Sequence, residues 1–369
     1  MTQVTTSSPT GNSPIVTSGT TSRTVFTVGD MIDRAFGRCK LAPQQISDEY
    51  LEIAQQMLYL QLSTLASEGI PLWCKQKQIY PIYESEQNIP LNTNVIDVLS
   101  CNLRTATRFS GGIATSSSGV ARNAFDFNFD TACTLEEVNG FIQMQFSGQL
   151  TAVIFGFMAN VTATWGYNWL GSNNGTDWTI LATIADQPVQ RGRWIWQDIQ
   201  GVTTHGYRFY RIQGDVNTTL DIIELVFQGR PNEIPVAKIN MNDYANLPDK
   251  WFPGRPVQMW YDKQLQDPQV TVWPSPQRQY TYAQMVLYVS RYIEDVGMDL
   301  TNSIEVPQRW LLAITTELAR NLAMEIPEIK PEVLSFLGPE ADRQLGRAWA
   351  SETDGAPTWL QPRIWNYTR

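Results

Sequence analysis

The feature that most constrains the fold is a change of residue pattern within the chain. Near both ends apolar residues recur at helical spacing, whereas the stretch 105–230 alternates apolar and polar residues between turns rich in Gly, Asn and Ser. This stretch lies inside a run without lysine between Lys77 and Lys238. Because the helical segments on its two sides must pack together to bury their apolar stripes, we predict that 105–230 is a module inserted into a discontinuous host domain.

Composition sets the broad class of protein. With 369 residues, of which 43% are hydrophobic and 17% charged, the chain is large enough for two domains. Its net charge of −9 does not favour tight binding to the phosphates of DNA. The four cysteines are widely spaced and form no Cys-x-x-Cys pair, which indicates reduced, buried thiols. We recognise no signal peptide, lipidation motif or apolar run of membrane length, so we expect a soluble protein that is made in a cytoplasm and binds no membrane.

Capping signals place two helices before the insert. Thr27, with Asp30 three residues later, predicts a capping box at the start of a helix that ends at Gly37. Ser47 predicts the N-cap of a longer helix, which ends before Gly69.

The remaining host elements are predicted from alternation and from prolines. Short strands of a small antiparallel sheet are expected at 79–83, 95–103, 257–261, 270–272 and 282–288. Two helices follow, the first opened by Pro307 and the second spanning Pro331–Ser351. We therefore predict an α+β fold class, in which 24–104 and 231–354 form a host domain made of a helical bundle and a small sheet.

Both chain ends are predicted to be extended arms. Residues 1–23 are rich in Ser, Thr, Gly and Pro, a composition that does not build a core. Residues 355–369 combine prolines with apolar side chains that are suited to contact another subunit, namely Trp359, Leu360, Ile364, Trp365 and Tyr367. The alternative is that both arms fold back on their own subunit.

Four host segments carry a family resemblance. They are IPLNTNVIDVLSCNLR (Ile89–Arg104), GRPVQMWYDKQ (Gly254–Gln264), VTVWPSPQ (Val270–Gln277) and EVPQRWLLAITTELARNLA (Glu305–Ala323). In this order they resemble the head-to-tail adaptor, or tail tubular, proteins of short-tailed bacteriophages. The resemblance implies a structural protein in the neck or tail of the virion, assembled in the cytoplasm of the host bacterium as a dodecameric ring below the portal.

That resemblance also implies partners. They are other copies of the chain, the portal protein, tail nozzle or tail fibre proteins, and genomic DNA that passes through the ring without tight binding. The helices that begin at Ser47 and Pro307 would form the ring wall, the arms would bind the portal or neighbouring subunits, and the insert would project outward. The alternative function is that of a carbohydrate-binding host-adhesion protein of a phage tail. A further alternative is an ordinary soluble protein with an aromatic-rich core.

The insert carries a second resemblance. Its successive segments are SSSGVARNAFDFNFDTACT, NGFIQMQFSG, YNWLGSNNGTDWTIL, YRFYRI and LDIIELVFQG. They resemble discoidin domains, the F5/8 type C or galactose-binding-like fold, which is common among carbohydrate-binding modules. The resemblance implies that 105–230 is an all-β, jelly-roll-like sandwich, with a turn over Ser172–Trp178 in which Gly175 takes a positive φ.

Discoidin-like domains often hold a structural calcium ion, and the resemblance places its ligands here. The matching positions are Asp126, Asn128, Thr131 and Glu224, and Phe127 stands where glycine is usual. Oxygen ligands of this kind suit calcium. The alternative is that Asp126 caps nearby backbone amides without a metal. No other cofactor is expected.

Aromatic residues alternate along two predicted strands of the insert. They are Trp165, Tyr167 and Trp169 on the first strand and Trp194 and Trp196 on the second. Such residues stack on sugars or contact other proteins when they are exposed, and they fill the core of a sandwich when they are buried.

Motifs for catalysis are missing from the sequence. His205 is the only histidine, which leaves little room for histidine-based catalysis or metal binding. We find no phosphate-binding loop, no dinucleotide fingerprint and no nucleophile elbow. We therefore expect that the protein is not an enzyme.

Overall fold

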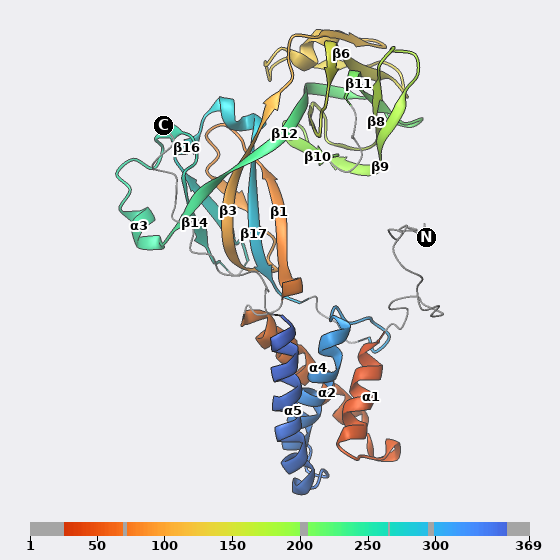
Figure 1. Cartoon of the computed structure of the whole chain (residues 1–369), viewed down its shortest axis with the longest axis vertical. Helices are drawn as coiled ribbons and strands as arrows, with labels where there is room; N and C mark the ends of the chain where they lie inside the picture. Colours follow the sequence, from red (N-terminus) through yellow and green to blue (C-terminus); the bar gives the residue numbers. More distant parts are fainter. Residues whose placement is uncertain (1–25, 69–71, 200–205, 265, 294–298, 353–369) are drawn as a thin grey trace, which may run out of the picture. The chain divides into compact units, whose positions relative to one another are not determined.

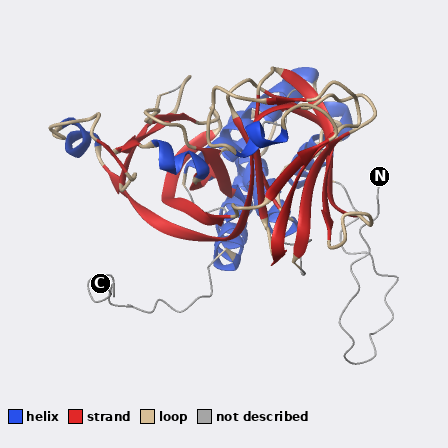
Figure 2. Cartoon of the chain, turned by 90° about the horizontal axis from the view of Figure 1, so that it is seen from above, coloured by secondary structure: helices blue, strands red, loops and turns tan. Residues whose placement is uncertain are grey.

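The computed structural model describes residues 26–68, 72–199, 206–264, 266–293 and 299–352. The chain divides into two compact units. We call Met1–Cys74 with Tyr292–Arg369 the helical unit, and Lys75–Arg291 the strand unit. Figure 1 labels the elements of both units, and Figure 2 shows that the strand unit consists of strands and loops with only short helical turns. None of the described helices is long and apolar enough to cross a membrane.

The helical unit is built around one central helix. Its main helices are α1 (Val28–Arg38), α2 (Asp48–Ser67), α4 (Gln308–Glu325) and α5 (Pro331–Ser351). Helix α4 contacts the other three, and its buried Trp310 ring meets the edge of Trp73 with 5.4 Å between the ring centroids.

The predicted helix starts are confirmed. The Thr27 hydroxyl accepts a hydrogen bond from the Asp30 N–H, and the Asp30 carboxylate accepts one from the Thr27 N–H, as a capping box requires. Ser47 accepts a hydrogen bond from the Tyr50 N–H at the start of α2. Pro307 directly precedes α4. Helix α1 ends at Arg38, one residue later than predicted.

The strand unit contains the small sheet. Its strands lie in the order β1 (Lys75–Pro81), β17 (Gln284–Arg291), β3 (Val95–Arg108), β12 (Asp221–Ile239), β14 (Gln258–Asp262), β15 (Gln269–Trp273) and β2 (Asn88–Pro90). Along this order the pairing of β12 with β14 is parallel and the other pairings are antiparallel. The strand predicted at 282–288 starts later, because Arg278–Tyr282 forms a 3-10 turn. Smaller elements are α3 (Met241–Ala245), β13 (Pro253–Gly254) and β16 (Ser275–Pro276).

The predicted β-sandwich forms the rest of the strand unit. One layer contains β10 (Trp194–Asp198), β7 (Ile154–Ala159), the first half of β12 and β5 (Cys133–Thr134). The other layer has the order β4 (Ile113–Ser116), β6 (Phe141–Leu150), β11 (Tyr207–Gly214), β8 (Ala163–Ser172) and β9 (Thr179–Val189). A core of aromatic and aliphatic side chains from both layers fills the space between them. The chain is therefore of mixed α+β class with a jelly-roll-like sandwich.

The observed division of the chain differs from the predicted host domain. The helices and the small sheet were expected to form one domain, but they fall in different compact units. The reason is that β3 and β12 run without a break from the small sheet into the sandwich. A separate apolar cluster, which includes Met158, Trp194 and Tyr282, also packs the outer face of the sandwich against the small-sheet region.

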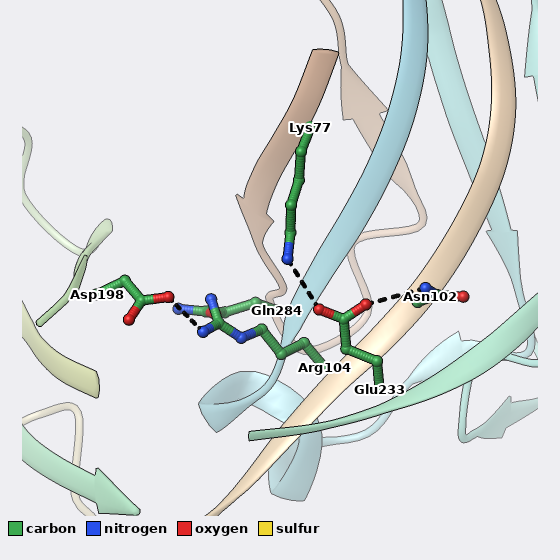
Figure 3. A network of polar contacts seen from close by, with 6 residues as sticks. All are labelled: Lys77, Asn102, Arg104, Asp198, Glu233 and Gln284. Atoms are coloured by element: carbon green, nitrogen blue, oxygen red, sulfur yellow. Dashed lines mark hydrogen bonds and ion pairs between the residues drawn. The ribbon is translucent and has the colours of Figure 1, made fainter. Parts of the chain in front are cut away.

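A polar network reinforces this seam between the small sheet and the sandwich (Figure 3). The Arg104 guanidinium, from β3, donates 2.6 Å to the Asp198 carboxylate at the end of β10 and 3.3 Å to the Gln284 side-chain oxygen. The Glu233 carboxylate accepts hydrogen bonds of 3.0 Å each from Lys77 and Asn102. Arg104 is only 3% exposed, so its charge depends on these partners.

Candidate functional site

The aromatic residues on β8 are core residues. Trp165, Tyr167 and Trp169 are 3%, 1% and 0% exposed. The Trp165 ring stacks on Phe157 at 5.6 Å between centroids, and the Trp169 ring lies 5.0 Å from Phe155. Alternate residues of β8 face the opposite layer of the sandwich, so of the two alternatives these three side chains fill the core and are not exposed for contact with a ligand or another protein.

The two tryptophans of β10 face the other way, into the seam. Their rings stack at 4.8 Å between centroids, and Trp194 is only 3% exposed. A side chain at Gly156 would come within 2.4 Å of the Trp196 ring, so the glycine makes room for the indole. This pair belongs to the apolar cluster that joins the sandwich to the small-sheet region.

The predicted calcium ligands lie close together, but other groups occupy their oxygens. The Asp126 carboxylate accepts hydrogen bonds from the Asn128 N–H at 2.9 Å and the Thr131 hydroxyl at 2.8 Å. Glu224 accepts one from the Phe127 N–H at 3.2 Å. Phe127 has a φ of 63°, the left-handed conformation for which glycine is usual at this position. The loop is thus held by side-chain caps, as in the alternative without a metal.

A positively charged side chain, Arg108, lies beside Glu224. The Arg108 guanidinium lies 4.6 Å from the centroid of the Phe127 ring and 4.7 Å from that of Tyr282, and these two rings stack on each other. Burial raises the pKa of Glu224 to about 8, although Tyr282 and Arg108 beside it oppose the rise. A protonated carboxyl group is a poor ligand for calcium, and the Arg108 cation beside Glu224 would repel the ion, so these side chains as they stand do not favour calcium.

Calcium is expected to leave the stability of the protein unchanged. Thermal unfolding of the full chain in millimolar calcium and in excess EGTA should give the same Tm, because the described residues offer no cluster of acidic side chains that could hold the ion. A rise in Tm with calcium that Glu224→Gln abolishes would restore the calcium interpretation.

Replacing Glu224 with glutamine is expected to reduce the pH dependence of stability. The folded pKa is raised from 4.5 to about 8, so between these values the unfolded carboxyl loses its proton while the folded one keeps it. This group therefore lowers the free energy of unfolding as pH rises through that window, by up to about 1.4 kcal/mol per pH unit, and adds no further change above it. Urea unfolding of wild type and Glu224→Gln at several pH values measures how the free energy of unfolding changes with pH. The same pH dependence in both proteins would contradict the raised pKa of Glu224.

A pocket opens at the seam, within the strand unit. We call it the seam pocket; it encloses about 350 Å³. It is lined by Tyr80, Pro81, Ile82, Tyr83, Glu86, Asn88, Ile89, Pro90, Gln190, Arg193, Trp194 and Val272. The small sheet contributes residues of β1, β2, their connection and β15, and the sandwich contributes the turn between β9 and β10 together with Trp194 at the start of β10. The pocket therefore exists only because the two regions pack together.

Polar contacts fix the walls of the seam pocket. Arg193 donates 2.7 Å to the Glu86 carboxylate, and its guanidinium lies 4.4 Å from the centroid of the Tyr83 ring. The Tyr83 hydroxyl accepts a hydrogen bond of 2.8 Å from the Trp194 N–H. Among the described residues, the indole N–H of Trp194 has no hydrogen-bond partner. The pocket therefore combines aromatic walls with preorganised polar groups, the usual chemistry of a small-molecule site.

The helical unit has a groove of its own. It encloses about 260 Å³ between α2, α4 and α5, and Leu60 and Trp349 in its lining are 56% and 42% exposed. Two buried acceptors in it, Gln61 Oε1 and Glu317 Oε2, have no hydrogen-bond partner among the described residues.

Some predicted residues lie outside the described part of the chain. These are His205 and the arm residues Trp359, Leu360, Ile364, Trp365 and Tyr367. The seam pocket, in contrast, was missed by the sequence analysis. Tyr83 and Arg193 are far apart in the chain, and no local pattern marks them as neighbours.

Comparisons with known proteins give likenesses to sugar-binding modules. No family model matches the chain, and no curated protein sequence matches it. CBM32 of AlyQ is 16% identical, with 34% of this chain and 99% of that chain covered and a TM-score of 0.30. CBM62 of Clostridium thermocellum Xyl5A is 20% identical, with 34% and 98% covered and a TM-score of 0.30. An F5/8 type C domain from Bacteroides fragilis is 10% identical, with 34% and 97% covered and a TM-score of 0.31. The ligands named for those modules are ligands of those modules and are not assigned to this chain.

Proposed function

We propose that this chain is a carbohydrate-binding attachment protein and that the seam pocket is its sugar site. The observation that carries the proposal is the lining of the pocket, in which tyrosine rings stand beside side chains that donate and accept hydrogen bonds. Aromatic rings offer a flat apolar face to the C–H groups of a sugar ring, while amide and carboxylate groups pair with its hydroxyls.

The polar lining suits a neutral sugar. Arg193 and Glu86 already neutralise each other as an ion pair of 2.7 Å. Asn88 and Gln190 add uncharged amides, each of which has both donors and acceptors. A pocket of about 350 Å³ lies within the usual range for small-molecule sites.

A glycan array followed by titration calorimetry tests the sugar site. For the best neutral glycan, Glu86→Ala is expected to weaken binding by about tenfold, the size of one charge-assisted hydrogen bond. Glu84→Ala is the matched control, because Glu84 is exposed nearby and does not line the pocket. The proposal is wrong if no neutral glycan binds, or if the Glu86→Ala and Glu84→Ala proteins bind equally well.

A second candidate function is that of the head-to-tail adaptor, a ring of copies bound to a portal. The helical unit favours it, because large apolar side chains lie exposed on its helices. They are Tyr59, Leu60, Leu312, Met324, Phe336 and Trp349. Exposed apolar surface of this kind is typical of a subunit interface. In this function the ring would sit in the neck of a virion, and the strand unit would face other virion proteins.

The mass of the purified protein, alone and with candidate portal proteins, tests the adaptor function. A closed ring is expected to form, and Phe336→Glu is expected to prevent it by placing a charge on the apolar surface. Val216→Glu is the control, because Val216 is 72% exposed in the strand unit and lies outside the helical surface. A chain that stays monomeric with every portal protein would exclude this function.

A further inference from the structure

A second pocket lies wholly within the sandwich. It encloses about 410 Å³ where the end of β3, β4, β6 and β12 meet the 3-10 turn Ala121–Phe125. It is lined by Arg108, Phe109, Ser110, Gly111, Gly112, Ala114, Arg122, Phe125, Met144, Glu224 and Leu225. It shares no residue with the seam pocket. We call it the arginine pocket.

Two guanidinium groups give the arginine pocket its charge. Neither Arg108 nor Arg122 makes an ion pair with a carboxylate among the described residues. Arg108 is nevertheless held in place, because its guanidinium packs against the rings of Phe127 and Tyr282. Glu224 lies beside Arg108 but no ion pair joins them, so both guanidinium groups keep donors for an acidic ligand group.

Backbone donors add to the positive character. Gly111 has a φ of 79°, and a side chain built there would meet nothing within 4 Å, so its peptide faces open space. A side chain at Gly112 would come within 2.5 Å of the Met144 sulfur, so only glycine lets the chain approach β6 this closely. Neither glycine N–H makes a hydrogen bond with a described residue. The pocket lining thus includes two backbone N–H groups without a described partner as well as two arginines, and donors of both kinds suit an anion.

Glu224 does not cancel this charge at neutral pH. Its carboxyl group is 1% exposed and accepts a hydrogen bond from the Phe127 N–H, and burial keeps its pKa near 8. Asp126, the other acidic group near Glu224, accepts two hydrogen bonds within its own loop. Because the lining contains two arginines and one carboxyl group, it keeps a net positive charge whichever protonation state Glu224 has.

We propose that the arginine pocket binds a hexuronic acid unit, a sugar that carries a carboxylate. The planar carboxylate would pair with the guanidinium groups of Arg108 and Arg122. Phe109, Phe125 and Met144 supply the apolar wall against which the sugar ring would rest. A volume of about 410 Å³ holds one or two sugar units. The proposal goes beyond the neutral-sugar function of the seam pocket and does not depend on it.

Titration calorimetry of the full chain with galacturonate, galactose and inorganic phosphate tests the proposal. Galacturonate is expected to bind, and Arg122→Gln is expected to weaken it by about tenfold or more, as the loss of one charge-assisted pair predicts. Arg122 is exposed, so this variant should fold; unchanged urea unfolding checks that. Arg191→Gln is the matched control, since Arg191 is an exposed arginine of the same sandwich outside the pocket.

Each other outcome would overturn the proposal. The proposed site is excluded if galacturonate does not bind, or if it binds Arg122→Gln as tightly as it binds wild type. Phosphate that binds as tightly as galacturonate and is weakened by Arg122→Gln assigns the pocket to simple anions. Galactose that binds as tightly as galacturonate and is weakened by Arg122→Gln shows that the carboxylate is not recognised. Glu86→Ala separates the two pockets, because it should weaken a neutral glycan and leave galacturonate unchanged.

Discussion

Replacing Trp169 with alanine is expected to destabilise the strand unit by about 3–5 kcal/mol. Trp169 is fully buried, packs against the rings of Phe155 and Phe157, and donates a hydrogen bond from its indole to Gln197. Removing the side chain loses these contacts and leaves a cavity that the surrounding strands cannot close. Urea unfolding, followed by tryptophan fluorescence and by circular dichroism, measures the change.

The control for this variant lies on the neighbouring strand. Ile180 is 59% exposed on β9, so Ile180→Ala should change the free energy of unfolding by less than about 0.5 kcal/mol. If Trp169→Ala kept full stability and only lost a bound sugar, Trp169 would be a ligand contact and its place in the core would be wrong.

Replacing Asp198 with alanine is expected to destabilise the strand unit by about 2–3 kcal/mol. The Arg104 charge is 3% exposed and would lose its carboxylate partner, which lies 2.6 Å away (Figure 3). Breaking a fully buried pair costs about 3–5 kcal/mol. The value here is smaller because the Asp198 side chain is 38% exposed, so water reaches the gap.

The Asp198 variant also tests how firmly the sandwich is joined to the small sheet. Thermal unfolding of wild type should show one transition for the strand unit, and Asp198→Ala should broaden or split it. Asp267→Ala is the control, since Asp267 is exposed in the same unit and makes no contact of this kind. A change below about 0.5 kcal/mol for Asp198→Ala would show that the pair contributes little.

Local signals in the sequence predicted local structure well. Thr27, Ser47 and Pro307 act within a few residues of their own position, so the helix starts follow from the sequence. The sandwich in 105–230 was predicted from its resemblance to discoidin domains, without the bounds of its strands. The unit boundary could not be predicted, because alternation along a strand does not tell which sheet each half of the strand joins. Strand β12 spans Asp221–Ile239 and pairs with β14 in the small sheet and with β7 in the sandwich.

The candidate sites depended on long-range packing and were harder to predict. Trp165 and Trp169 alternate in the same way whether they face a ligand or a core, so the pattern alone cannot distinguish the two. The burial of both side chains shows that they belong to the core. Glu224 matched a calcium ligand by position, but Arg108 and Tyr282 come from distant segments and change its chemistry. The seam pocket depends on the contact between Tyr83 and Arg193, and no sequence motif predicts that contact.

The continuity of β3 and β12 has a mechanical consequence. Both strands enter the sandwich side by side and pair with each other, so a pull on the sandwich moves them together. Within the small sheet, the load then falls along the strands, on the pairings of β3 with β17 and of β12 with β14. Hydrogen bonds that are loaded in this shearing direction must break together and cannot open one at a time. A single-molecule pulling experiment should therefore find this junction stronger than a flexible linker between two independent domains.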